Sequence, residues 1–230
     1  MTLELITGLA LIALPVAFNA AFGLLGARFD YPDVLRRPTA EVLERFRAGG
    51  TALVLTWWAF ALTAVAFAPV AVLVSTVAAG ADPAVLALAT TFGVLAAAVQ
   101  AVGLVRWPFA VPYLARAVEG PDVPAARREA VDVVFQTLNR SLGVGVGEHL
   151  GYGLTGLWSL FAGVALIQSD VVPAALGWIG VALAPAFLLG ALEFVGPWEE
   201  RGWRVAGPLV PIAYVAWSLW LLVLGVALIA

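Results

Sequence analysis

The sequence contains no cysteine and no lysine, and its single histidine is His149. Without cysteine the chain cannot form a disulfide, a thiolate metal site or a redox dithiol. Without lysine it cannot form a Schiff base with a carbonyl cofactor. One histidine beside one glutamate is too few ligands for a zinc site, and one histidine excludes bis-histidine haem ligation within the chain. We therefore predict no cofactor and no metal site.

Charged residues of any kind are scarce. They make up 12% of the 230 residues, whereas 63% are hydrophobic and the mean hydropathy is +1.00. Soluble domains contain roughly 45–50% apolar and ~25% charged residues, so a soluble fold of this chain would expose large apolar patches. The composition predicts a protein whose solvent is the lipid bilayer. The length suits one integral membrane domain covering residues 1–230.

Six long apolar runs follow one another along the chain, and each supplies the ~20 residues that a helix needs to cross a bilayer. The predicted fold class is all-α, a polytopic bundle of six transmembrane helices. Residues 1–5 carry Glu4 and no basic residue, unlike a signal peptide, so the first run is expected to be a retained span. The predicted spans are about 3–26, 51–79, 84–106, 144–168, 172–193 and 207–229.

All twelve basic residues are arginine, and they follow only the first, third and fifth apolar runs. They are Arg28, Arg36, Arg37, Arg45, Arg47, Arg106, Arg116, Arg127, Arg128, Arg140, Arg201 and Arg204. The positive-inside rule makes that side cytoplasmic, which places both termini outside (N-out/C-out). Five or seven spans would divide the arginines between the two sides.

Two short cytoplasmic amphipathic helices are predicted between the spans. Thr39 fits the N-cap of the first, Gly49 fits its end, and Val42, Leu43 and Phe46 form its apolar face. The second covers about 123–139. Both helices could rest on the membrane surface or dock on the bundle. Acidic residues interleave with the arginines, so we predict no binding of nucleic acid.

Polar residues inside the predicted spans gather in the half nearer the arginines. They are Asn19, Gln100, Arg106, Glu148, His149 and Glu193. Because such groups are costly in hydrocarbon, this grouping predicts a polar vestibule that faces the cytoplasm. Trp57, Trp58, Trp107 and Trp203 fit an aromatic belt at the cytoplasmic interface, whereas Trp158, Trp217 and Trp220 are expected deeper.

The fourth predicted span carries two ordered rows of side chains. Helical spacing places Glu148, Tyr152, Thr155 and Ser159 on one face. A neighbouring row of small residues, Gly143, Gly147, Gly151 and Thr155, predicts close approach of another helix. Glu148 is expected to pair with a donor, Arg106 first. This pair could be structural or part of a site, and His149 could equally be a hydrogen-bonded packing residue.

Three segments carry a resemblance to a known family. They are FDYPDVLR at 29–36 followed by PTAEVL at 38–43, RWPFAVP at 106–112 and EHLGY at 148–152. Together they resemble a bacterial family of uncharacterised multi-span membrane proteins classed as a domain of unknown function. The resemblance implies a multi-pass protein of the bacterial inner membrane, and it implies no reaction.

Three functions are compatible with these features. The first, which needs the fewest assumptions, is binding or transport of a small hydrophobic or amphipathic molecule, such as a lipid, in the vestibule. Its candidate ligand-binding residues are Glu148, His149, Tyr152, Arg106, Glu193, Asn19, Gln100 and Trp158. The second is an accessory or scaffold role in a membrane complex or homo-oligomer. The third is an intramembrane enzyme using Glu148 and His149, but the chain offers no complete catalytic set.

Overall fold

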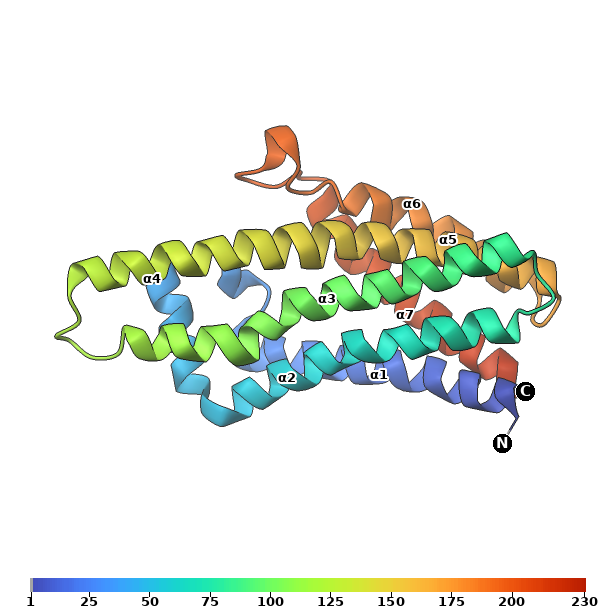
Figure 1. Ribbon diagram of the computed structural model, residues 1–230, viewed down its shortest axis with the longest axis horizontal. Coiled ribbons are helices and arrows are strands. Elements are labelled where there is room, and N and C mark those ends of the chain that lie inside the picture. The colour runs from blue at the N-terminus through green and yellow to red at the C-terminus, as the bar shows by residue number, and fades with distance from the viewer. Residues whose placement is uncertain (1) are drawn as a thin grey trace.

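A computed structural model of the protein describes residues 2–230, and the chain is helical almost throughout (Figure 1). The long helices are α1 (Leu3–Phe29), α2 (Thr39–Val77), α3 (Pro83–Ala117), α4 (Ala125–Leu138), α5 (Gly151–Ser169), α6 (Ala174–Gly190) and α7 (Ala206–Ile229). A π-helix, η2 (Asn139–Leu150), joins α4 to α5, and the short 3-10 helices η1 (Asp33–Arg36) and η3 (Gly196–Trp198) lie in connections. The predicted all-α class is confirmed.

Local sequence signals account for several helix ends. The Thr2 side chain accepts a hydrogen bond from the Leu5 N–H at 3.3 Å and so caps α1. The Asp82 carboxylate accepts one from the Ala84 N–H at 2.7 Å, with Pro83 in the first turn of α3. Both features satisfy or remove N–H groups that have no partner within the helix. Asp30 and Asp170 adopt left-handed backbone conformations that end α1 and α5.

Five helical stretches are long and apolar enough to cross a membrane. They are Leu3–Phe29, Thr39–Val77, Pro83–Ala117, Ala125–Ser169 and Ala206–Ile229, with mean hydropathies from 1.6 to 2.3 in their most apolar windows. Helix α6 is apolar as well but has 17 residues, fewer than the ~20 that a bilayer core requires. The chain is therefore a multi-pass membrane protein with five long candidate spans and a shorter sixth apolar helix.

Both termini lie at one end of the bundle, together with the α2–α3 and α5–α6 turns (Figure 1). The connections α1–α2, α3–α4 and α6–α7 lie toward the opposite end. All twelve arginines belong to these three connections or to the halves of the helices that adjoin them. We call this the arginine end of the bundle.

The second amphipathic helix, predicted at 123–139, corresponds to α4, but no loop separates it from the span that follows. Helix α4 continues through η2 into α5 without interruption, so residues Ala125–Ser169 form one stretch of 45 residues. A turn would have left backbone groups without partners, whereas the π-helical segment keeps them hydrogen-bonded through the glycine-rich sequence. The predicted helix is therefore present as α4, and what the sequence did not predict is that it runs on into the following span.

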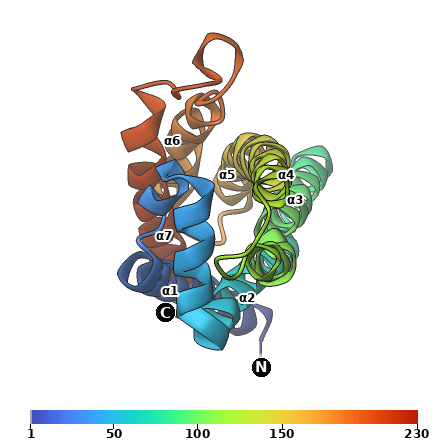
Figure 2. The same ribbon diagram turned by 90° about the vertical axis from the view of Figure 1, so that its left-hand side faces the viewer.

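The first amphipathic segment, residues 39–49, is set at an angle to the rest of α2. Gly50 adopts φ 55° and ψ −154°, a conformation that glycine tolerates and that breaks the helical geometry there. The segment crosses the arginine end of the bundle (Figure 2). Its apolar residues Val42, Leu43 and Phe46 are buried, so it docks on the bundle rather than resting on the membrane surface.

Thr39 does not cap this segment as predicted. The N-cap position belongs to Pro38, and Thr39 is the first helical residue. The Thr39 hydroxyl instead accepts a hydrogen bond from the Gln136 side chain of α4 at 2.9 Å. Thr39 therefore ties the docked segment to α4.

Two aromatic cores hold the bundle together. Phe67, Trp158, Trp217 and Trp220 are buried in its middle, as the sequence predicted for the three tryptophans. The second core lies toward the arginine end, where the Trp57 and Trp107 rings stack with their centroids 4.4 Å apart. These two side chains are 0% and 1% exposed, so their predicted place in an aromatic belt is wrong. Packing among α1, α2 and α3 buries them completely.

Candidate functional site

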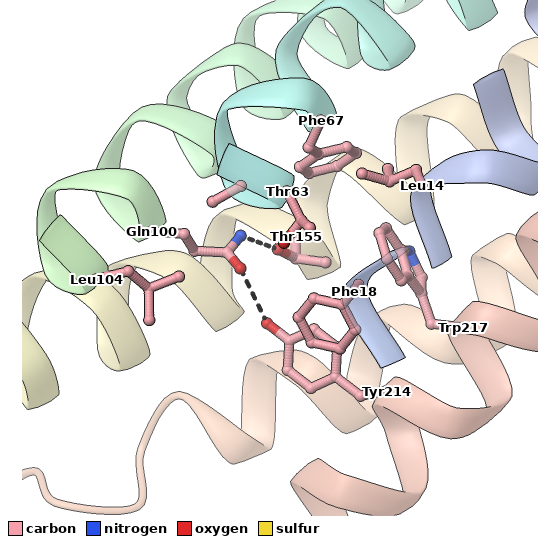
Figure 3. A pocket seen from close by; sticks show the side chains of 10 residues that line it. Leu14, Phe18, Thr63, Phe67, Gln100, Leu104, Thr155, Tyr214 and Trp217 are labelled. Carbon is pink, nitrogen blue, oxygen red and sulfur yellow. Dashed lines mark hydrogen bonds between the residues drawn. The ribbon is translucent and has the colours of Figure 1, made fainter. Parts of the chain in front are cut away.

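A cavity lies inside the bundle, between α1, α2, α3, α5 and α7 (Figure 3). Its volume is about 30 Å³. Most of the wall is apolar: Leu14, Phe18, Ala64, Phe67, Leu104 and Trp217. This volume is well below the ~300–1,000 Å³ typical of ligand pockets. One or two water molecules fit without movement, and a larger ligand requires wall side chains to move apart.

One wall of the cavity is polar and is built from three helices. The Gln100 amide of α3 donates a hydrogen bond to the Thr155 hydroxyl of α5 at 3.2 Å. The Tyr214 hydroxyl of α7 donates to the Gln100 side-chain oxygen at 3.3 Å (Figure 3). This network joins helices that are far apart in the sequence, and it fixes the orientation of each group.

The small-residue row of the fourth predicted span positions this wall. A Cβ atom built on Gly103 would lie 2.7 Å from the Gly147 Cα atom, so α3 and η2 touch backbone to backbone. A Cβ atom on Gly151 would lie 2.8 Å from the Gln100 side chain. The predicted close approach is confirmed, and α3 is the helix that makes it. Glycines at these positions let Gln100 reach Thr155.

Arg106 lies about two turns beyond Gln100 on α3, and only 8% of its surface is exposed. Its guanidinium donates to the Gly103 carbonyl oxygen and, at 3.0 Å, to the Asn139 side-chain oxygen at the start of η2. The six ion pairs formed among residues 2–230 do not include the predicted pair between Arg106 and Glu148. Asn139 forms this hydrogen bond with the guanidinium because η2 places the Asn139 side chain directly alongside α3.

Glu148 is half-buried on η2 and makes no hydrogen bond or ion pair among the described residues. Tyr31, in the connection after α1, lies near Glu148. The pKa of Tyr31 is raised to about 12, mainly by burial; the nearby Glu148 contributes to the rise and Arg106 opposes it. The phenol, the carboxylate and the guanidinium therefore share one region near the arginine end.

His149 and Glu193 both lie near the end of α6. The His149 Nδ1 atom lies 2.7 Å from the Ala191 carbonyl oxygen at the end of α6, a hydrogen bond that orients the ring. Glu193 follows in the α6–α7 connection, where burial raises the pKa of its carboxyl and the arginine Arg36 lowers it. No group of three or more His, Cys, Asp or Glu residues that could hold a metal occurs among residues 2–230.

Sequence comparison extends over almost the whole of this bundle. Residues 6–225 match the family described as "Domain of unknown function (DUF4386)". The chain belongs to this family. The resemblance drawn from three short segments is thereby confirmed. No curated protein and no solved structure matches the chain. The family description states no activity, so a function for this DUF4386 protein has to be argued from its side chains.

Of the eight candidate ligand-binding residues, the structure of this DUF4386 protein places only Gln100 in the cavity wall. Tyr152 contacts a wall residue, with its ring centroid 5.7 Å from that of Tyr214. Asn19 donates to the Ser218 hydroxyl at 3.0 Å and joins α1 to α7. Trp158 is fully buried in the central core, 5.8 Å from the Trp217 ring.

Glu148, His149, Arg106 and Glu193 do not line the cavity either. Sequence reasoning missed Tyr214 and Thr63, which do. Each is a hydroxyl inside a long apolar run, and the rule that singled out Gln100 would have found them. A Ser, Thr or Tyr hydroxyl is a weaker sign of a polar site than an amide or a charge, because a hydroxyl can often form its hydrogen bond within its own helix.

Proposed function

We propose that this DUF4386 protein binds a small amphipathic molecule in the cavity between α1, α2, α3, α5 and α7. The observation that supports this most is the composition of the wall, which is mainly apolar and aromatic with one fixed hydrogen-bonding network. Small-molecule sites have this composition, in which apolar contacts give affinity and a few polar groups give orientation.

We place the cavity in the cytoplasmic half of a bacterial inner membrane. Six crossings, with α6 as a short sixth span, leave every arginine on the side that the positive-inside rule makes cytoplasmic, and both termini outside. A 17-residue helix crosses if neighbouring residues complete it or the bilayer thins locally.

The ligand enters, in this proposal, from the arginine end. The polar row of η2 and α5 supports that direction, because Glu148, Tyr152 and Thr155 follow one another toward the cavity. Tyr152 contacts Tyr214 in the cavity wall, and Glu148 is half-buried and free of partners among residues 2–230. A carboxylate at the entrance and a neutral network inside would orient an amphipathic molecule. Transport would in addition require an opening toward the end of the bundle that carries the two termini.

Filling the cavity tests this proposal. Ala64 lines the cavity on α2, whereas Ala66 on the same helix is exposed to the surroundings of the bundle. Native mass spectrometry of gently purified protein should detect a copurified small molecule on the wild type and on Ala66→Leu. The same adduct should be lost or strongly reduced on Ala64→Leu. Identical spectra for all three proteins, at equal thermal stability, would contradict binding in this cavity.

The accessory or scaffold role has less support from the contacts. A partner could dock on the apolar face of an amphipathic segment, but in the first segment Val42, Leu43 and Phe46 are already buried on the bundle. The enzyme hypothesis required Glu148, His149 and Tyr152 to converge on one cavity. His149 instead bonds to the end of α6, and these three residues lie outside the cavity wall.

A further inference from the structure

The hydrogen-bond donors in the cavity wall are all used by the protein itself, which restricts what the cavity can recognise. Gln100 has two amide hydrogens. Its nitrogen donates to the Ala96 carbonyl oxygen at 3.2 Å and to the Thr155 hydroxyl oxygen at 3.2 Å. The Tyr214 hydroxyl has one hydrogen, which it donates to the Gln100 oxygen at 3.3 Å. Neither side chain keeps a donor for a ligand.

The two threonines of the wall are in the same state. Thr155 donates to the Gly151 carbonyl oxygen at 2.7 Å, and Thr63 donates to the Phe60 carbonyl oxygen at 2.6 Å. Each bond runs back to the residue's own helix, as buried threonines in membrane helices commonly arrange. A hydroxyl carries one hydrogen only, so neither threonine has a hydrogen left to donate to a ligand.

The last donor in the wall is the Trp217 indole. Its Nε1–H donates to the Ser159 hydroxyl oxygen at 3.1 Å, away from the cavity. Indole nitrogen donates and does not accept, so Trp217 offers the cavity only its ring. The four polar side chains of the wall and the Trp217 indole therefore direct every side-chain N–H and O–H at another protein atom.

Acceptor capacity remains on four of these side chains. The Gln100 oxygen and the Thr155 oxygen each accept one of the two hydrogen bonds that they can accept. The Thr63 and Tyr214 hydroxyl oxygens accept none among the described residues. A ligand group that enters the cavity meets oxygen lone pairs and aromatic faces.

Charge is absent from the wall as well, because its ten residues include no Asp, Glu, Arg or His. An ion in hydrocarbon without a counter-charge is costly, so the wall does not suit a carboxylate, an ammonium group or a metal cation. A carbonyl group, which only accepts hydrogen bonds, would face oxygen atoms without a shared hydrogen. The remaining chemistry is an uncharged group that donates a hydrogen bond.

We infer that the ligand is an uncharged alcohol, whose hydroxyl donates to the network of Gln100, Thr155 and Tyr214 while its apolar body lies against Phe18, Phe67 and Trp217. This inference rests on the proposed binding function and names the ligand class for the same cavity. It also gives the direction of the hydrogen bond, from ligand to protein. Water, which has the same donor group without an apolar body, is the competing occupant.

A ligand series that shares one ring and differs in one polar group tests the inference. The probes are 4-fluorobenzyl alcohol, 4-fluorobenzaldehyde, 4-fluorobenzylamine and 4-fluorotoluene, observed by fluorine NMR with the full chain in detergent micelles. For each probe, the signal change measured with Ala64→Leu is subtracted from the signal change measured with wild type. The subtraction removes the contribution of probe that partitions into the micelle, and the affinity is taken from the difference. Ala66→Leu serves as the matched control and should match wild type.

The alcohol should bind best, about three- to tenfold more tightly than the aldehyde or the toluene, the factor expected for one hydrogen bond. Binding of the aldehyde or the amine as tight as that of the alcohol would overturn the inference while leaving the proposed binding function intact. If no probe distinguishes wild type from Ala64→Leu, the cavity holds water only and the proposed function fails as well.

Thr155→Val gives a second test that a general loss of structure cannot imitate. Valine has nearly the shape of threonine, but it removes the acceptor of one Gln100 amide hydrogen. That hydrogen becomes available to a ligand, so the preference should shift toward 4-fluorobenzaldehyde by about threefold or more. Thr63→Val is the matched control: it removes a hydroxyl outside this network and releases no side-chain donor, so the ratio of alcohol to aldehyde affinity should stay that of wild type. An unchanged ratio in Thr155→Val would contradict the assigned hydrogen-bond direction.

Discussion

Arg106 shows how a buried charge finds partners that a sequence does not reveal. Its guanidinium is almost fully enclosed and is held by the Gly103 carbonyl and the Asn139 side chain. Hydrogen bonds that involve a charged group are stronger than neutral ones, and a buried charge that loses a partner is strongly destabilising. The contact also ties α3 to the start of η2.

Asn139→Ala should therefore lower the free energy of unfolding by about 1–3 kcal/mol. The substitution leaves the guanidinium buried with one partner fewer, and a lower midpoint of thermal unfolding in the same detergent would report the loss. Thr137→Ala is the matched control, because the Thr137 hydroxyl bonds only to the Val133 carbonyl of its own helix. Equal midpoints for the two variants would show that the Arg106–Asn139 hydrogen bond does not stabilise the fold.

Glu148→Gln should leave the unfolding midpoint unchanged or raise it. The Glu148 carboxylate has no partner among residues 2–230, and a half-buried charge without partners costs free energy that a neutral amide does not. Thermal unfolding of the two proteins at neutral pH measures the difference. A decrease in unfolding midpoint as large as that of Asn139→Ala would instead indicate that Glu148 pairs with Arg106, as the sequence predicted.

At the scale of elements, the π-helical segment η2 is the least ordinary part of the fold. π-Helices are rare, mostly limited to a single turn and frequent at functional sites, whereas η2 covers twelve residues. It contains Gly143, Gly145 and Gly147, and it packs directly on α3. The close contact of Gly147 with Gly103 explains how so wide a helix fits beside its neighbour.

Gly103→Ala should destabilise the protein by about 1–3 kcal/mol, the range for overpacking. The added Cβ atom would lie 2.7 Å from the Gly147 Cα atom, and two backbones cannot move aside as a flexible side chain does. Gly23→Ala on α1 is the control, since its added Cβ atom has nothing within 4 Å. Both changes raise intrinsic helix propensity, so a lower unfolding midpoint for Gly103→Ala alone isolates the contact.

At the scale of the whole molecule, the distribution of arginine predicts which ends of the helices share an aqueous compartment. Because the natural sequence has no cysteine, single cysteines can be introduced without background. Arg36→Cys, Arg127→Cys and Arg201→Cys should all react with a membrane-impermeant maleimide only after the cytoplasmic face is exposed. Gly80→Cys and Ala230→Cys should react in intact spheroplasts. Labelling of Arg36→Cys and Arg127→Cys from opposite sides would contradict the proposed orientation and the cytoplasmic vestibule.

The elements were predictable to different degrees, for physical reasons that particular residues illustrate. Helix α1 could be located because a charge-free run needs a membrane whatever it contacts. The continuity of α4 through η2 could not, because π-helical geometry depends on the fit of Gly147 against Gly103. The burial of Trp57 and Trp107 could not either, since tryptophan is equally suited to an interface and a core.

The sequence by itself determined that this is an all-α protein of the membrane, and the order of its apolar runs and arginines predicted that the arginines share one end of the bundle. Both follow from the free energy of moving a residue from water into hydrocarbon, which depends on the residue type and hardly on its partners. Only the tertiary structure decided which polar groups meet. Gln100 contacts residues 55 and 114 positions away, and a hydrogen bond requires two atoms within about 3 Å, which helical spacing within one span cannot specify.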